Sequence, residues 1–266
     1  MTANLAEFSD STIKMPVLFV GHGSPMNAIE DTEFSLAWAE AGQSLPRPKA
    51  VLCISAHWET VGTHVTAAER PKTIYDFLGF PQALYEVSYP APGSPALAGL
   101  VQRTLRTTPV RLDPGRGLDH GAWAVLCRMF PEADVPVVQL SLDRGKGPAF
   151  HYGLAQELRS LRDKGVLILG SGNIVHNLGR MAWEDMAFDW AVEFDQKMRQ
   201  LIAAGDHDAI IHYENLGQAA HLSVPTREHF LPLLYVLALQ DKGEELVFFA
   251  EKVTLGSMSM RSVRMG

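Results

Sequence analysis

The sequence lacks the features that define several large classes of protein. It has 2 cysteines in 266 residues, so neither a disulfide framework nor a cysteine-based zinc module can be built from it. Its formal net charge is -7 at pH 7, which disfavours nucleic-acid binding by neutralisation of phosphates. It has no uninterrupted apolar run of the about 18 residues that a membrane-spanning helix requires. Since 47% of the residues are hydrophobic, the chain has enough apolar side chains for a sizeable globular core.

The cysteines and the N-terminal residues indicate where such a protein works. Cys53 and Cys127 stand among apolar residues, in VLCIS and AVLCRMF, which is typical of buried free thiols in a reducing compartment. Residues 1–14 contain acidic residues and no apolar run, so we expect a loose leader and no secretory signal. We therefore predict a cytoplasmic protein with a single catalytic α/β domain over residues 15–266.

Short apolar runs alternate with amphipathic stretches along this domain. The runs are rich in Val, Leu or Ile and are bounded by Gly, Pro or Lys, as expected of strands buried on both faces; they cover residues 17–20, 50–55, 135–141 and 166–170. The amphipathic stretches predict helices over residues 33–42, 94–106, 122–129, 148–164, 189–204 and 226–239. Residues 245–253 and 256–260 predict a terminal strand or two. This order predicts a three-layer αβα fold with a mostly parallel central sheet.

Four histidines stand where such a fold places its ligands. His22, His57 and His176 each follow an apolar run directly or through a short turn, and His229 stands near the start of an apolar helix. Ligands of open α/β sheets gather at the carboxyl ends of the strands, and imidazole is the commonest metal ligand. The pattern predicts a metal centre, although two of the four could instead cap helices or pack.

The remaining histidines carry less information. His120, in DHGAW, precedes a helix and could equally be a cap or a site residue, and His221 is ambiguous. Four others stand in contexts that look solvated: His64, His151, His207 and His212. The chain has no G-x-S-x-G nucleophile elbow and no H-E-x-x-H helix, which excludes the common serine hydrolases and zincin proteases.

Several strings together resemble one enzyme family. They are GHGSPMN, SAHW, TIYDFLGFPQALYEVSYPAPGSP, DHGAW, PVVQLS, SGNIVHNL and PTREHFLPLLY, in the family's order from about Pro16 onward. These strings are similar to those of the DOPA 4,5-extradiol dioxygenase family, within the class III extradiol ring-cleavage dioxygenases. The resemblance implies an oxidoreductase of aromatic compound metabolism, whose partners are a small-molecule catechol and O2 and which uses a non-heme metal.

The resemblance also implies roles for five histidines. His22 and His57 match two metal-binding histidines, and His229 matches a third. His176 matches a residue that is either a further ligand or the acid/base beside the metal, and His120 matches one that contacts substrate or dioxygen. Because the third ligand is a histidine where iron dioxygenases usually have a carboxylate, the working metal stays open. We expect Fe(II) to be that metal and Zn2+ to occupy the purified protein, since zinc binds nitrogen sites more tightly.

Two questions stay open at this point. A zinc hydrolase on the same scaffold, in which three histidines activate a water, is the main alternative function. Tyr75, Asp76 and Phe80 lie in a loop like that of the family and are candidates for substrate binding, but ordinary loop packing would also explain them. The sequence does not indicate an oligomeric state.

Overall fold

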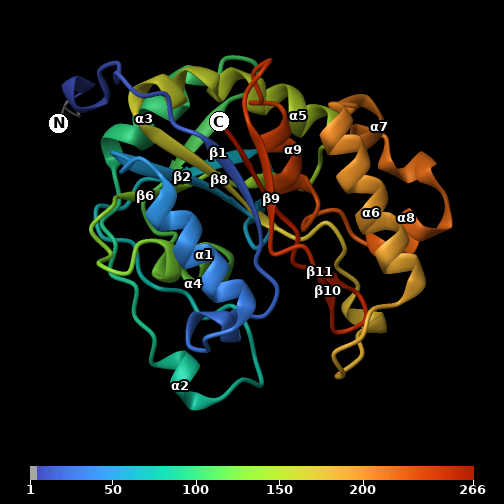
Figure 1. Ribbon diagram of the computed structural model, residues 1–266. Helices are drawn as coiled ribbons and strands as arrows, with labels where there is room; N and C mark the ends of the chain where they lie inside the picture. The colour runs from blue at the N-terminus through green and yellow to red at the C-terminus, as the bar shows by residue number, and fades with distance from the viewer. Residues whose placement is uncertain (1–4) are drawn as a thin grey trace.

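A six-stranded sheet forms the centre of the protein, as Figure 1 shows for the computed structural model, which describes residues 5–266. The strand order is β6-β2-β8-β1-β12-β9. The bounds are β6 Val137–Gln139, β2 Ala50–Ser55, β8 Val166–Gly172, β1 Val17–Gly21, β12 Ser262–Met265 and β9 Leu246–Phe249. The first four strands are parallel, and β12 pairs antiparallel with both β1 and β9. The predicted α/β class with a mostly parallel sheet is confirmed.

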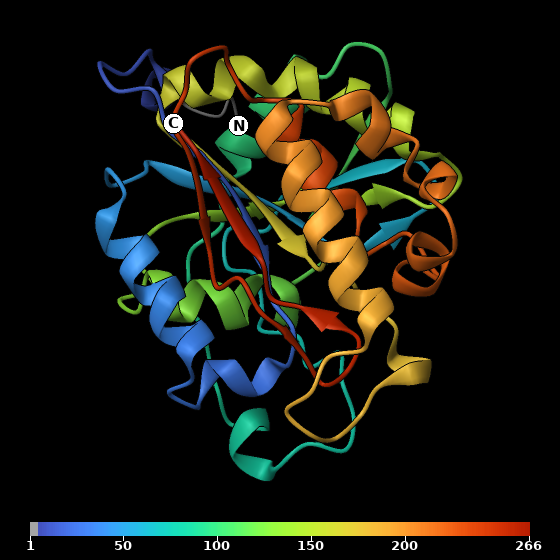
Figure 2. The same ribbon diagram turned by 45° about the vertical axis from the view of Figure 1, so that its right-hand side comes forward.

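Helices cover both faces of this sheet (Figures 1 and 2). On one face, α1 (Glu33–Ser44) and α4 (His120–Met129) pack in a cluster that includes Leu18, Val51 and Leu167. On the other, α3 (Pro95–Thr104), α5 (Pro148–Gln156), α6 (Asp189–Ala204) and α9 (Leu231–Leu237) pack in a cluster that includes Phe19 and Leu52. Every residue of β1, β2 and β8 is buried, because successive side chains point to opposite, equally covered faces. This explains why these strands read as continuous apolar runs.

Shorter elements complete the chain. The helices are α2 Gln82–Tyr85, α7 His207–Ile211 and α8 Gln218–Ser223, with 3-10 turns at Leu5–Phe8, Pro25–Ala28, Glu157–Lys164, Leu178–Arg180 and Tyr213–Leu216. Three two-stranded sheets pair β3 (Glu59–Thr60) with β7 (Leu142–Asp143), β4 (Thr63–Thr66) with β5 (Val110–Asp113), and β10 (Val253–Thr254) with β11 (Met258–Ser259).

Some boundaries differ from the sequence-based expectation for identifiable reasons. The helix expected over residues 226–239 begins only at Leu231, since Pro232 has no N–H to donate and belongs in a first turn. The helix expected over residues 148–164 continues as a 3-10 helix after Gln156. Strand β12 was not expected, and it occupies the sheet position between β1 and β9.

The N-terminal segment contacts the body of the domain where it is described. The side chain of Phe8 is buried, and the Ser11 N–H donates to the Asp163 carbonyl at 2.6 Å. Residues 1–4 of the expected leader lie outside the described residues. Cys53 and Cys127 are both free thiols, as predicted, the first buried and the second partly buried. Among residues 5–266 no helix is long and apolar enough to cross a membrane.

Candidate metal centre and active site

The parallel strands bring three of the predicted histidines to one edge of the sheet. His22 follows β1 directly, His57 follows β2, and His176 follows β8 through a short turn. The fourth, His229, precedes α9, and its carbonyl accepts a hydrogen bond from the Asn173 N–H at 2.8 Å. Gly172 makes this approach possible, because a Cβ there would lie 2.1 Å from the His229 carbonyl oxygen.

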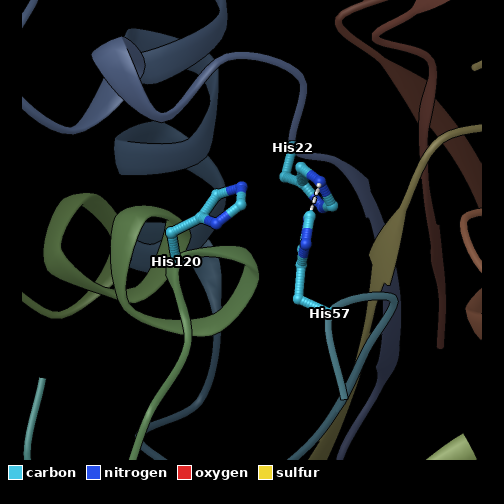
Figure 3. A group of neighbouring side chains, drawn as sticks. All are labelled: His22, His57 and His120. Atoms are coloured by element: carbon cyan, nitrogen blue, oxygen red, sulfur yellow. Dashed lines mark hydrogen bonds between the residues drawn. The ribbon is translucent and has the colours of Figure 1, made fainter. Parts of the chain in front are cut away.

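The rings of His22, His57 and His229 lie close to one another. The Nε2 atoms of His22 and His57 lie 3.0 Å apart (Figure 3). The ring centroids are 4.9 Å apart for His22 and His57, 5.3 Å for His22 and His229, and 4.9 Å for His57 and His229. Three imidazoles from separate elements at such distances have the composition of a metal site.

An oxygen atom lies beside the Nδ1 of each of these three rings. The Nδ1 of His22 lies 3.0 Å from Ser171 Oγ, and that of His229 lies 3.0 Å from Glu228 Oε1. The Nδ1 of His57 is 3.6 Å from Asp76 Oδ2. Metal-binding histidines usually donate their other ring N–H to such a partner, which sets the tautomer and leaves Nε2 free for the metal.

The Nε2 atom of His229 gives an independent test of whether the site fits a metal. It is buried and has no hydrogen-bond partner within residues 5–266. A buried polar nitrogen without a partner costs about 1–3 kcal/mol, so a ligand at this atom would remove a real penalty. The residues therefore fit a metal ion.

His120 belongs to the same cluster. The N-cap of α4 is Asp119, whose side chain accepts from the Ala122 N–H, and His120 is the first residue of the helix rather than its cap. Its ring faces His22 and His57, and ring nitrogens of the three lie within 4.8 Å of one another (Figure 3). This proximity makes His120 a candidate for metal contact as well as for contact with substrate.

His176 lies beside His229. The two rings are stacked, with centroids 3.4 Å apart and planes at 9°. Ring nitrogens of both histidines and a carboxylate oxygen of Glu228 lie within 4.8 Å of one another. His176 therefore lies next to His229 and close to the cluster.

Burial dominates the protonation of these groups. It holds the pKa of His22 and His229 well below the usual range, and the neighbouring imidazoles act in the same direction. Burial also lowers the pKa of His57 and of His176 to about 4. Burial alone would raise the pKa of Asp76, but its hydrogen bonds with His120 outweigh this and lower it to about 2. At neutral pH these four imidazoles are unprotonated, which is the form that binds metals.

The three loop residues predicted to bind substrate, Tyr75, Asp76 and Phe80, have different contacts in the structure. Asp76 Oδ1 accepts hydrogen bonds from the His120 N–H at 2.9 Å and, at 3.0 Å, from the ring Nδ1. The hydroxyl of Tyr75 donates to the Val87 carbonyl, and the ring of Phe80 packs on Phe77. Thus Asp76 contacts the cluster, while the described contacts of Tyr75 and Phe80 are loop packing.

Three residues of the site were missed by sequence reasoning. Phe77 places its ring 5.5 Å from that of His120, and Ser171 and Glu228 hold histidine nitrogens. Two of them could have been found from their neighbours in the sequence, since Glu228 directly precedes His229 and Phe77 lies within the candidate loop.

Two of the remaining histidines need a correction. His207 is half-buried, with Nδ1 2.9 Å from the Tyr152 hydroxyl and Nε2 3.0 Å from Gln240 Oε1. His151 is buried and not solvated, with Nδ1 2.9 Å from the Tyr235 hydroxyl and Nε2 3.3 Å from the Asp143 carbonyl. The signal was present in the sequence, since His151 stands three and four residues before the buried Leu154 and Ala155 on the same face of α5. His221 is exposed and lines a cavity beside the cluster.

Known proteins are similar to this chain over nearly its full length. It is 45% identical to "4,5-DOPA dioxygenase extradiol" of Escherichia coli (strain K12), with all of both chains covered. It is 42% identical to the protein of that name from Beta vulgaris, over 96% of this chain and 98% of the relative. The crystal structure of an uncharacterized protein from Escherichia coli K12 superposes with a TM-score of 0.83 at 42% identity, over 95% of this chain and 100% of that one. Residues 16–259 match the family described as the catalytic LigB subunit of aromatic ring-opening dioxygenase. The chain therefore belongs to the LigB family of aromatic ring-opening dioxygenases.

Proposed function

We propose that this ring-opening dioxygenase cleaves a catechol beside its two hydroxyl groups, at a non-heme metal held by His22, His57 and His229. The observation that carries the proposal is the arrangement of the three imidazoles, each with an oxygen beside Nδ1 and with ring centroids no more than 5.3 Å apart. The sequences named 4,5-DOPA dioxygenase extradiol support a catechol with an amino-acid side chain as substrate.

The metal defines the chemistry that the site can perform. Bound Fe(II) would supply the redox chemistry with which both atoms of O2 enter the ring, and Zn2+ could not. Zn2+ competes for a site of nitrogen ligands, so we propose that purified protein carries zinc and regains activity with iron.

His176 and His120 are proposed to move protons at this site. Burial keeps the imidazole of His176 unprotonated at neutral pH, so it can accept the proton of a catechol hydroxyl. The hydrogen bonds from His120 to Asp76 orient its ring toward His22 and His57, where its other ring nitrogen, once protonated, can donate to an oxygen of the substrate or of O2.

The test is anaerobic loading of the metal-free protein with Fe(II), followed by O2 uptake and the appearance of a yellow ring-opened product. His22→Ala and His229→Ala should abolish both metal binding and turnover. His176→Ala should keep the metal and lose turnover if it is an acid/base, and should lose both if it is a ligand. The exposed His212→Ala serves as the control. Absence of O2 uptake with every catechol tried would refute the proposal.

The zinc hydrolase has less support, because the family and the relatives named above are dioxygenases. It predicts metal-dependent hydrolysis of an amide or ester without any O2 requirement, which the same oxygen electrode would reveal. A hydrophobic cluster on each face of the sheet supports a three-layer αβα domain over residues 15–266 as the scaffold. The free thiols support a cytoplasmic location.

A further inference from the structure

A cavity of about 570 Å3 lies beside the histidine cluster and carries charges of both signs. Its charged side chains are those of Glu59, Arg144, Glu214, Arg227 and Glu228. They come from segments far apart in the sequence, which the tertiary structure brings to one wall. Such a mixed lining differs from the apolar lining typical of small-molecule sites and favours a ligand that itself carries both charges.

Glu228 joins this cavity to the proposed metal centre. Its carboxylate contacts His229 Nδ1 at 3.0 Å and lies within 4.8 Å of a nitrogen of His176, while its side chain also lines the cavity. Glu59, which also lines the cavity, stands two residues after His57. The cavity therefore begins one side chain away from the rings. In an amino-acid catechol, three bonds of about 1.5 Å separate the ring from the carboxylate carbon, so the charged end of such a substrate lies a short distance from its ring.

Several of the charges in the cavity have no partner. Within residues 5–266, neither Arg144 nor Arg227 forms an ion pair, and neither does Glu59. The pairing of β3 with β7 and a hydrogen bond from the Arg144 N–H to the Thr60 carbonyl at 3.0 Å hold two of these residues in place.

We propose that this cavity recognises the α-amino acid end of a catechol substrate. The Arg227 guanidinium, with Arg144 beside it, pairs with the carboxylate, and Glu59 accepts hydrogen bonds from the ammonium group. Planar guanidinium groups bind carboxylates through two parallel hydrogen bonds, which supplies orientation as well as affinity. The catechol hydroxyls are then directed toward the histidines, and this recognition rests on the proposed ring-cleavage function.

The test compares four catechols that differ in which charged groups their side chains carry. L-DOPA carries both, dopamine lacks the carboxylate, 3,4-dihydroxyphenylpropionate lacks the ammonium, and 4-methylcatechol lacks both. Steady-state O2 uptake is measured for the iron-loaded wild type and for Arg227→Gln, Arg144→Gln and Glu59→Gln. The control is Arg103→Gln, the same change of charge on helix α3, and circular dichroism and thermal unfolding verify that each variant is folded.

We expect Arg227→Gln to raise KM about 10- to 100-fold for L-DOPA and for the propionate, with kcat and the values for dopamine and 4-methylcatechol changed about twofold at most. Glu59→Gln should raise KM for L-DOPA and dopamine but not for the two catechols without an amine. A uniform effect on all four catechols, or none on any, overturns the inference while ring cleavage stands. If the wild type cleaves none of the four, ring cleavage itself fails and the inference falls with it.

Discussion

Asp76 is the residue whose replacement most directly tests the architecture of the site. Its carboxylate contacts two histidines at once, with Oδ1 3.0 Å from His120 Nδ1 and Oδ2 3.6 Å from His57 Nδ1. Asp76→Asn keeps the shape and one acceptor oxygen but removes the charge. A hydrogen bond to a charged group contributes about 1.5–3 kcal/mol, against about 0.5–1.5 kcal/mol for a neutral pair. Loss of such a partner of a metal-binding histidine typically costs about 10- to 100-fold in affinity or activity.

We therefore expect Asp76→Asn to weaken metal binding at least about 10-fold, or about 1.4 kcal/mol, and to reduce kcat further because His120 loses its orienting charge. Metal affinity is measured by competition with a chromophoric chelator under anaerobic conditions, and kcat by O2 uptake. Asp31→Asn is the matched control, since this carboxylate is 75% exposed and its ion pair with Arg128 lies on the surface.

The same carboxylate predicts a pH dependence with a definite sign. Its pKa is about 2 in the folded protein against 3.8 in the unfolded chain, so it stabilises the fold above pH 3.8 and loses this effect as the pH falls toward 2. The shift corresponds to about 2 kcal/mol, which solvent at the partly exposed side chain reduces to about 1 kcal/mol. An Asp76→Asn variant with wild-type metal affinity, turnover and acid stability would refute this reasoning.

Three further predictions concern stability. Gly172→Ala should weaken metal binding and lower the unfolding midpoint, because its Cβ would meet a backbone carbonyl at 2.1 Å. Gly153→Ala adds a Cβ in open space at an exposed position of α5 and should stabilise the protein by about 0.5–1 kcal/mol; equal midpoints would contradict this. In the wild type, the buried Arg261 guanidinium lies 2.5 Å from the Asp195 carboxylate. Asp195→Ala removes this partner and should lower the free energy of unfolding in urea by about 3–5 kcal/mol. A decrease of less than about 1 kcal/mol would be inconsistent with that contact. The metal-free protein should lose stability as the pH falls from about 6.5 to about 4. Over this range the histidines of the unfolded chain become protonated, whereas buried imidazoles of the folded protein, such as His57 with a pKa of about 4, stay neutral. A urea midpoint that stays constant over this range would count against this prediction.

Local sequence patterns were sufficient for the central strands and for the place of the site. The runs at β1, β2 and β8 are apolar throughout because both faces of the sheet are covered, so their pattern and their burial have one cause. The histidines that follow them then had to meet, since parallel strands end at one edge. The position of β12 was not predictable in this way, because a short C-terminal segment carries no signal for which strand it will pair with.

The sequence by itself determined that this is an α/β protein with histidines at the ends of parallel strands, and its strings indicated the dioxygenase family. Only the tertiary structure decided how those histidines are held. Asp76 stands 19 positions after His57 and 44 positions before His120, so its contacts with both depend on how a long loop folds back. The charged cavity likewise exists only where β3, β7 and the segment before His229 meet. Periodicity reports which face of an element is buried, whereas the partner of a polar side chain is set by the packing of elements distant in sequence.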